Sequence, residues 1–327
     1  VKFKINDLKS VDERLSSVMA LYVDRAGYLW IGTNDSGLCR YAPDSGEMVF
    51  YTTEEGLSAD AIRALCENDR GDLYVGTISS LSVISADGQI VDSHDEWTEL
   101  TGVRSLCHDG NGVIAGVSNG GTLFFVKDRT LIESGTYDAE GIYYAAVATD
   151  GRGSFLVGTS ANELLRMTFD GVRIGRERAV DTDSISYFND LLYDATTDGY
   201  FFCAENGLGY LAADDAVTKL SQDRFENSIS DAIIDYQGNI WFCSNKQGIL
   251  EYSRNPFVNV FVKAGMESGV VNALLASGDD LYIGMDSGLT VLDKSTWARR
   301  DYAFEKTFSG VRIRHLMEDS AGNIWVS

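Results

Sequence analysis

The chain has 327 residues with 27 basic and 49 acidic side chains, so its formal net charge is −22. This charge disfavours nucleic acid and anionic membrane surfaces as partners, because binding there depends on neutralising phosphates with basic groups. A single hydrophobic core stops growing at roughly 250–300 residues, so the length predicts either two domains or one modular array. The 44% hydrophobic content indicates a chain that folds.

No apolar run reaches the roughly 18–20 residues that span a bilayer, and the first residues lack the pattern of a secretion signal. We therefore expect a fragment of a longer protein, with any signal peptide or membrane segment outside this sequence. The cysteines form no C-x-x-C pair, and their odd number leaves at least one thiol unpaired. We expect the five cysteines, Cys39, Cys66, Cys107, Cys203 and Cys243, to be buried free thiols. We expect no metal ion or other cofactor.

A motif recurs from one end of the chain to the other. It appears as DRAGYLWIGTNDSGL at 24–38 and returns, among other places, as DYQGNIWFCSNKQGIL at 235–250 and DSAGNIWVS at 319–327. The turn residue of the motif marks a period of about 42 residues, which is typical of a four-stranded propeller blade. The eight marker positions are Gly27, Gly71, Gly112, Gly153, Gly199, Gly238, Asp279 and Gly322.

Each repeat predicts four short antiparallel strands. In the first repeat, alternating apolar residues at 18–23 lead through an Asp/Gly turn to a second stretch at 28–32, and two more stretches follow at 38–43 and 47–52. Period-two alternation bounded by Gly, Asp and Asn is typical of strands and hairpins. Because no repeat has an amphipathic helical pattern, we predict an all-β, seven-bladed β-propeller of four-stranded antiparallel blades, with eight blades as the alternative.

The ends of the chain suggest how the ring closes. The first residues resemble the outer-to-inner strand connection at 49–65, so we expect residues 2–5 to supply the fourth strand of the last blade. The first three strands of that blade fall within 270–293. This interpretation assigns 1–296 to the propeller and 297–327 to the truncated start of a following propeller or to an additional blade.

Two recurrent residue types are expected to be structural. An Asp or Asn precedes six of the eight turn residues, where its short side chain can hydrogen-bond the backbone two residues on, at Asp24, Asn68, Asp109, Asp150, Asp235 and Asp319. A metal site needs several such oxygens to converge, and these copies lie on separate blades. An aromatic residue also recurs in the second strand and is expected to fill the space between blades, at Trp30, Tyr74, Phe202, Trp241, Tyr282 and Trp325.

The pattern D-x-x-G-x-I/L-W-I-G-T followed by G-L-x-x-Y resembles the two-component regulator propeller repeat, over essentially the whole chain. The resemblance implies an extracytoplasmic sensor module, on the periplasmic or extracellular side of a bacterial inner membrane. Members typically carry one or two propellers, an immunoglobulin-like domain, a membrane helix and a histidine kinase or diguanylate cyclase. Many respond to oligosaccharides. The expected partners are therefore an oligosaccharide, downstream domains of the same protein and a second copy of the chain.

A ligand site is expected where the repeat is broken on the inner strands, because these strands face the central channel of a propeller. The slot eight residues before the turn Gly holds Arg63 and Arg104 in neighbouring repeats. Two guanidinium groups suit a carboxylate or sulfate on an acidic sugar. The alternative is that they neutralise acidic residues such as Glu67 or Asp60. After allowance for insertions, Asp190 and Asn272 take the same slot.

Aromatic residues in the outer-to-inner connections are further candidates, because flat rings stack on the apolar faces of sugars. Trp97, Tyr144 and Tyr187 occupy such positions, and acidic neighbours suggest that the strand of Trp97 is solvated. Enzyme chemistry has weaker support, because the three histidines share no spacing and no G-x-S-x-G elbow occurs. We predict a non-catalytic module. A propeller lyase or glycosidase and a purely structural interaction propeller are the alternatives.

Overall fold

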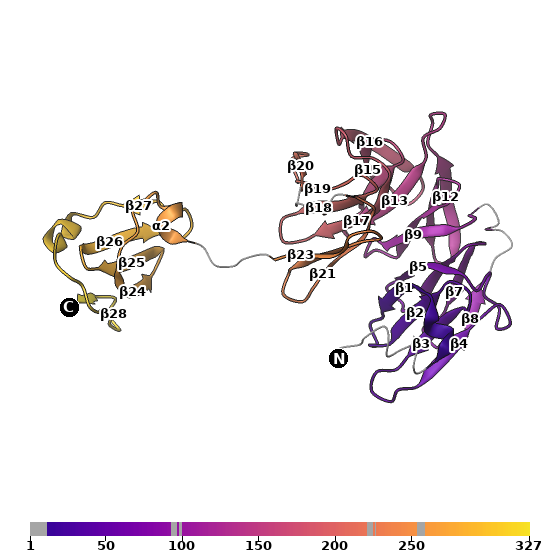
Figure 1. The fold of residues 1–327 in the computed structure, drawn as a ribbon, viewed down its shortest axis with the longest axis horizontal. Helices are drawn as coiled ribbons and strands as arrows, with labels where there is room; N and C mark the ends of the chain where they lie inside the picture. Colours follow the sequence, from indigo (N-terminus) through magenta and orange to yellow (C-terminus); the bar gives the residue numbers. More distant parts are fainter. Residues whose placement is uncertain (1–11, 93–96, 98–99, 221–224, 226, 254–258) are drawn as a thin grey trace. The chain divides into compact units, whose positions relative to one another are not determined.

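The computed structural model describes residues 12–92, 97, 100–220, 225, 227–253 and 259–327. The chain forms two compact units, Val1–Ser253 and Arg254–Ser327, each considered by itself (Figure 1). The described residues build six four-stranded sheets, one three-stranded sheet and one two-stranded sheet, and every strand pair in them is antiparallel. The all-β propeller class is confirmed, and the number of blades remains a prediction. No helix in the described ranges is long and apolar enough to cross a membrane.

The first unit begins with a 3-10 helix, η1 (Glu13–Ser16), and continues with six sheets in chain order. The first sheet consists of β1 (Val18–Val23), β2 (Leu29–Thr33), β3 (Leu38–Tyr41) and β4 (Met48–Tyr51). The second consists of β5 (Ile62–Glu67), β6 (Leu73–Thr77), β7 (Leu81–Ile84) and β8 (Ile90–Asp92). The third consists of β9 (Val103–His108), β10 (Val113–Ser118), β11 (Thr122–Lys127) and β12 (Thr130–Thr136). The fourth sheet consists of β13 (Tyr144–Thr149), β14 (Ser154–Thr159), β15 (Glu163–Phe169) and β16 (Ile174–Asp181). The fifth consists of β17 (Phe188–Asp194), β18 (Gly199–Ala204), β19 (Gly207–Leu211) and β20 (Val217–Lys219). The sixth consists of β21 (Ile229–Ile234), β22 (Ile240–Ser244) and β23 (Gly248–Tyr252).

The second unit contains one four-stranded sheet and the two-stranded sheet that follows it. Its elements are α2 (Val260–Lys263), β24 (Val271–Ser277), β25 (Asp280–Met285), β26 (Gly288–Asp293), β27 (Arg299–Arg300), η3 (Ala303–Phe308), β28 (Leu316–Glu318) and β29 (Ile324–Val326). The strand next to β26 is β27, in the place that the sequence analysis gave to residues 2–5, so this sheet extends past the predicted boundary at 296. Residues 2–5 lie outside the described residues, and closure of the ring by them stays a prediction.

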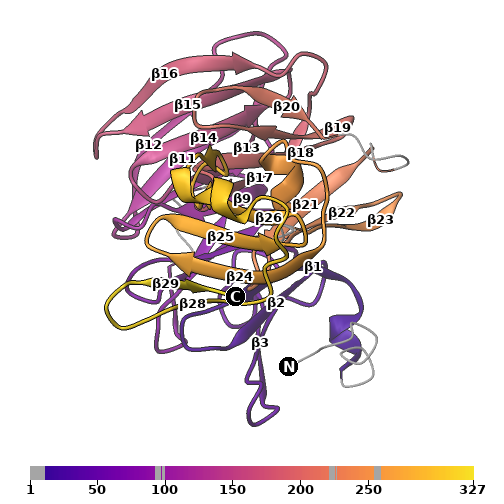
Figure 2. The same ribbon diagram turned by 90° about the vertical axis from the view of Figure 1, so that its left-hand side faces the viewer.

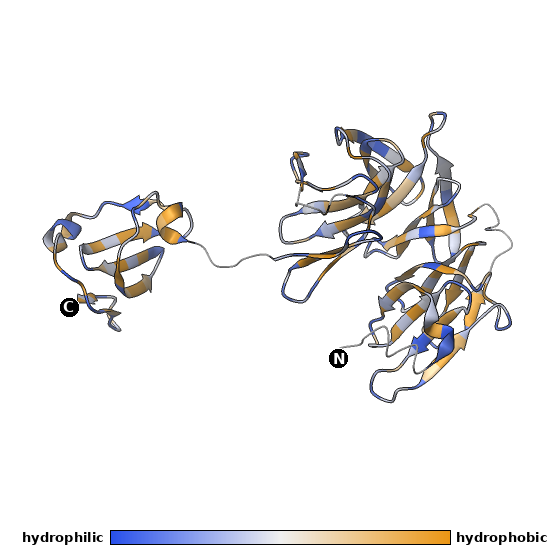
Figure 3. Cartoon of the chain, viewed as in Figure 1, coloured by the Kyte–Doolittle hydropathy of each residue, from blue (hydrophilic) through white to orange (hydrophobic). Residues whose placement is uncertain are grey.

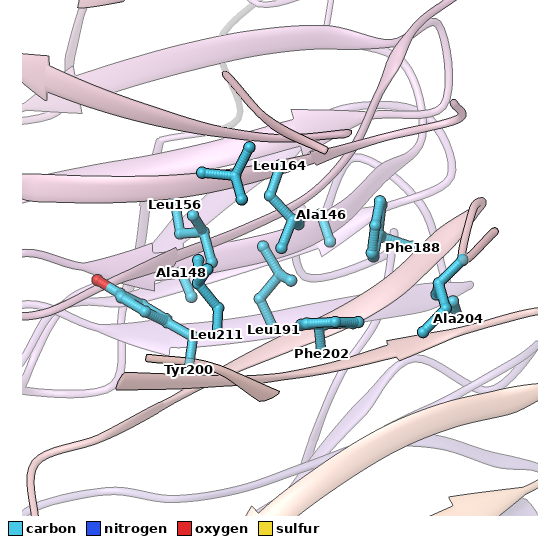
Figure 4. Close-up of a cluster of buried hydrophobic side chains, with 12 residues drawn as sticks. Ala146, Ala148, Leu156, Leu164, Phe188, Leu191, Tyr200, Phe202, Ala204 and Leu211 are labelled. Atoms are coloured by element: carbon cyan, nitrogen blue, oxygen red, sulfur yellow. The ribbon is translucent and has the colours of Figure 1, made fainter. Parts of the chain in front are cut away.

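The core of the first unit lies between neighbouring sheets. The inner strands β1, β5, β9, β13, β17 and β21, which are labelled in Figure 1, contact one another in succession, so each sheet lays one face on the next. Figure 2 shows the same strands except β5, which is not labelled there, turned by 90°. In one such cluster, side chains from β13–β15 meet those from β17–β19, and Phe188 packs edge-on against Phe202 (Figure 4). Hydrophobic residues accordingly follow the strands, while hydrophilic residues gather at the turns (Figure 3).

The repeated aromatic residue fills the space between sheets at Trp30, Tyr74 and Phe202, which are at most 4% exposed. Trp241 and Tyr282 are half-buried, and Trp325 is 60% exposed. The aromatic prediction is therefore confirmed for Trp30, Tyr74 and Phe202.

The turn before the second strand has the structure expected from its Asp and Gly. Asp24 accepts hydrogen bonds from the backbone N–H of Tyr28 at 2.9 Å and from Trp30 Nε1 at 2.7 Å. Gly27 has a φ of +86°, which favours glycine. The same Asp–Trp bond recurs from Asp235 and Asp319, so these aspartates hold the hairpins together. The five cysteines are free thiols. The prediction that they are buried holds for Cys39, Cys66 and Cys203, whereas Cys107 and Cys243 are half-buried.

Candidate binding site on the inner strands

A β-bulge occurs near the start of the inner strand in seven of the sheets. The seven inner strands are β1, β5, β9, β13, β17, β21 and β24. One residue has no partner in the register there, and a bulge re-aims the side chain that it carries. The seven bulge residues in the described part of the chain are Met19, Arg63, Arg104, Ala145, Asn189, Ser230 and Asn272.

Of the residues assigned to the slot from the sequence, Arg63, Arg104 and Asn272 are bulge residues and Asp190 is not, and their role in ligand binding stays a prediction. In β17 the bulge falls on Asn189, because Phe188 pairs with Ala204 and Asp190 pairs with Cys203. The sequence shows that this repeat has a different length but does not show where the extra residue is absorbed. Asp190 is thus the residue after the bulge, a position with different surroundings.

The position after the bulge normally holds alanine opposite glycine. Four sheets have this pair, at Ala20–Gly32, Ala64–Gly76, Ala146–Gly158 and Ala273–Gly284. Glycine is needed here because the following strand approaches closely: a Cβ on Gly158 would lie 2.6 Å from the Cβ of Phe188. The three departures are Ser105 opposite Val117, Asp190 opposite Cys203 and Asp231 opposite Cys243.

Asp190 and Asp231 form a pair of carboxyl groups on the neighbouring strands β17 and β21. The backbone N–H of Ala232 donates to Asp190 Oδ2 at 3.1 Å and to Asp231 Oδ1 at 2.9 Å. Burial, and then the charge of Asp231, raises the pKa of Asp190 well above its usual range. Burial also raises the pKa of Asp231. Asp190 therefore favours its protonated form, which allows it to lie against a second carboxylate.

Cys203 belongs to the same cluster. Burial raises the pKa of its thiol well above the usual range, and the charges of Asp190 and Asp231 act in the same direction. Across from it, Ser230 Oγ lies 3.3 Å from Cys243 Sγ. A protonated thiol in this environment is a poor nucleophile, so Cys203 contributes packing rather than reactivity.

The position after the bulge also joins adjacent sheets in the third repeat. Ser105 Oγ accepts a hydrogen bond from Val147 N at 3.2 Å and donates to Val147 O at 3.3 Å. This is the same cross-sheet contact that Asp190 makes to Ala232. Asp190 therefore has a structural role as well as a chemical one. Asp231 as a whole residue keeps surface that a ligand can reach, although its carboxyl group is partly desolvated.

The two arginines of the slot have different surroundings. Arg63 donates from Nη2 to Asn34 Oδ1 at 3.0 Å and from Nη1 to Ile62 O at 3.0 Å. It forms no ion pair with Glu67 or Asp60 within the described residues, so the neutralisation alternative is wrong for this side chain. Arg104 is half-buried without a hydrogen bond or ion pair to the described part of the chain, and burial lowers its pKa.

Asn272, in the second unit, is engaged locally. Its Nδ2 donates to Asp286 Oδ1 at 2.7 Å, and Arg312 pairs with the same oxygen at 2.8 Å. This bulge therefore presents an amide, a carboxylate and a guanidinium group together. Such a set can bind hydroxyl groups through both donors and acceptors.

The aromatic candidates separate into a buried and an exposed group. Trp97 is 1% exposed and belongs to the core beside Tyr74 and Phe124, so its prediction as a solvated sugar platform is wrong. Its backbone carbonyl accepts a hydrogen bond from Ser80 Oγ at 3.0 Å, which helps to hold Trp97 in the core. Tyr144 is half-buried and packs edge-on against Tyr137, whereas Tyr187 is 54% exposed.

Tyr187 sits at the start of β17 with a φ of +60°, three residues before Asp190. Its ring and the polar groups of the inner strands are the exposed features available to a ligand. No group of three or more His, Cys, Asp or Glu side chains in the described ranges is arranged to hold a metal ion.

The structure is similar to several solved propellers. One is the extracellular domain assigned to a hybrid two component system from B. thetaiotaomicron, with a TM-score of 0.60 and 16% identity over 94% of this chain and 43% of that one. Another is a streptogramin B lyase, with a TM-score of 0.56 and 12% identity over 95% and 90% of the two chains. A third is a virginiamycin B lyase from Staphylococcus aureus, with a TM-score of 0.58 and 13% identity over 82% and 92%.

At these identities the likeness shows the fold alone. The chain spans less than half of the length of the B. thetaiotaomicron domain. No curated protein matches the sequence. The family model described as "two component regulator propeller" matches residues 13–35, which confirms the resemblance in the first repeat.

Proposed function

We propose that this chain is a non-catalytic, extracytoplasmic sensor module of a membrane signalling protein and that it recognises an oligosaccharide. The observation that carries the proposal is the set of polar residues on the inner strands, at positions where other sheets have alanine and glycine. The family model at residues 13–35 and the fold shared with an extracellular domain of a hybrid two component system support it.

Asp231, Arg104 and Tyr187 are the residues of the first unit that we assign to ligand contact. The carboxyl group of Asp231, on a residue that keeps exposed surface, accepts hydrogen bonds from sugar hydroxyls. Arg104 supplies donors that have no partner within the described residues. The exposed ring of Tyr187 offers an apolar surface for stacking. Arg63 and Asp190 hold this surface in place through Asn34 and Ala232, and Asn272 offers a second polar cluster in its own unit.

Signal transfer in the parent protein requires the ligand to bind one arrangement of the propeller and its downstream domains better than another. A kinase or cyclase output and a second copy of the chain are part of this proposal. Native mass spectrometry of the chain with and without ligand measures whether a dimer forms.

A thermal-shift screen of the full chain against a panel of oligosaccharides tests the proposal. We expect at least one oligosaccharide to raise the melting temperature, with the shift lost in Asp231→Ala and Arg104→Ala. Arg176→Ala on the outer strand β16 is the matched control and keeps the shift. If no oligosaccharide stabilises the chain, or if all three variants respond as the wild type does, the sensor proposal is wrong.

A glycan lyase is a second candidate, favoured by the carboxyl pair Asp190–Asp231. A carboxyl group with a raised pKa beside an ionised one can serve as acid and base. Mass analysis of the screened oligosaccharides separates the two functions: a sensor leaves them intact, whereas a lyase yields products that disappear in Asp190→Asn.

A further inference from the structure

Two clefts between adjacent sheets of the first unit are built from corresponding parts of the repeat. The first lies between the sheets β1–β4 and β5–β8, has a volume of about 380 Å³ and includes Asp24, Tyr28, Arg40 and Glu67 in its lining. The second lies between the sheets β13–β16 and β17–β20 and has a volume of about 210 Å³. Each cleft contains an arginine from the third strand of its first sheet.

These two arginines occupy the same register position. Arg40 pairs with Trp30 across β2 and β3, and Arg166 pairs with Leu156 across β14 and β15. Arg166 has a carboxylate partner: its Nε donates to Asp215 Oδ1 at 2.6 Å, from the turn between β19 and β20. Asp215 adopts a φ of +67° to reach this place.

The corresponding turn of the first cleft, between β7 and β8, has Gly88 instead, with a φ of +83°. A Cβ on Gly88 would lie 2.9 Å from Arg40 Nη1, so this turn lies beside the guanidinium group, as the turn of Asp215 does in the second cleft. Gly88 has no side chain and therefore places no carboxylate beside Arg40. Arg40 has no hydrogen bond or ion pair to the described residues. Its guanidinium carbon lies 4.9 Å from the centre of the Tyr28 ring.

The carboxylates of the first cleft are already engaged. Asp24 accepts from Tyr28 N and Trp30 Nε1. Glu67 accepts from Arg25 N at 3.0 Å, and Asp69 pairs with Arg25 at 3.3 Å. Arg40 is therefore a half-buried cation that lines a cavity and has unused donors in a fixed fork.

We propose that the cleft beside Arg40 binds a small ligand with one carboxylate and adjacent hydroxyl groups. The guanidinium fork matches a carboxylate in a bidentate arrangement. Glu67 and Asp69 pair with Arg25 and keep lone pairs that can accept hydrogen bonds from hydroxyls. The cleft lies past the end of β1, at Asp24, whereas the bulge lies near the start of that strand. This site is therefore separate from the inner-strand site and does not depend on the proposed sensor function.

Isothermal titration of the full chain with D-glucuronate tests this proposal, with acetate and D-glucose as comparison ligands. We expect glucuronate to bind, acetate to bind more weakly because it lacks hydroxyls, and glucose to give no binding. Arg40→Gln is expected to weaken glucuronate binding at least tenfold. Gly88→Asp is expected to do the same, because it supplies the carboxylate that Asp215 provides in the second cleft. Arg166→Gln is the matched control and leaves binding unchanged.

Circular dichroism establishes that each variant is folded. The proposal is overturned if the wild type does not bind glucuronate at millimolar concentration, or if folded Gly88→Asp and Arg40→Gln bind it as the wild type does. Equal binding of acetate overturns the role of the hydroxyl groups, and equal binding of glucose overturns the role of the carboxylate.

Discussion

The sheets with alanine opposite glycine and the sheets with aspartate opposite cysteine have the same inner-strand bulge and the same antiparallel pairing. They differ in the contact that this position makes with the inner strand of the next sheet. At Ala146–Gly158 the next strand packs directly against the backbone, whereas Asp190 reaches Ala232 through a carboxyl group. The comparison shows that one backbone position can serve either close packing or polar chemistry, according to the side chains that it carries.

Filling the space at Gly158 is expected to have the largest effect on stability. Gly158→Val places a branched side chain against Phe188, and overpacking of this kind costs about 3 kcal/mol of the free energy of unfolding. Cys203→Val is the matched change in a sheet that already has a side chain here, and it should cost under about 1.5 kcal/mol. Urea unfolding of both variants measures the difference. Equal losses would show that the two positions are not distinguished by packing.

Replacing the ionisable carboxyl group of Asp190 is expected to stabilise the chain at high pH. The unfolded Asp190 releases its proton near its ordinary pKa, while the folded one retains it because its pKa is raised. Stability from this group is therefore complete below the ordinary pKa and is lost as pH rises toward the folded pKa. Asp190→Asn avoids this loss, and we expect it to be more stable than the wild type at pH 8, with a smaller difference at pH 5.

Asp198→Asn is the control with the opposite sign. Hydrogen bonds from Tyr193 and Arg152 lower the pKa of Asp198, so its contribution to stability is present above the ordinary pKa and is lost on acidification. This variant should be less stable than the wild type at pH 8. If Asp190→Asn instead loses stability at pH 8, Asp190 is ionised in the folded chain and our account of the pair fails.

Removing the hydroxyl of Ser105 is expected to have the smallest effect. Ser105→Ala loses the hydrogen bonds to Val147 across the sheets and should cost about 1 kcal/mol. Ser134→Ala, on the outer strand β12 and exposed, is the control that should change stability by less than about 0.5 kcal/mol. Chemical unfolding of the two variants compares them. If the two variants lose the same free energy of unfolding, the hydrogen bonds of Ser105 to Val147 do not stabilise the contact between the sheets.

The strands and turns could be predicted from the sequence because their signals are local. Residues 18–23 and 62–67 alternate in hydrophobicity and form β1 and β5 with those bounds. Asp24 and Gly27 are likewise set by the geometry of one hairpin. The bulge in β17 could not be placed, because Asn189 and Asp190 both fit the sequence pattern and only pairing with β18 decides between them.

Contacts between sheets could not be predicted from the sequence pattern, because they join residues of different repeats. The acidic neighbours of Trp97 suggested solvent, but its burial depends on Tyr74 and Phe124 in two different sheets. The unpaired state of Arg40 depends on Gly88, 48 positions away in the chain. Asp231 was missed as a site residue, although a comparison of its Asp–Cys pair with the Ala–Gly pairs of other repeats is a signal that could have found it.

The most direct test of the account is an NMR titration of the side-chain carboxyl carbons of Asp190 and Asp231 in the full chain. We predict that Asp190 titrates well above the ordinary aspartate value of about 4 and that its midpoint falls in Asp231→Asn, where the neighbouring charge is gone. A midpoint near 4 that does not respond to this substitution would contradict the carboxyl pair and, with it, the distinction between the two kinds of sheet.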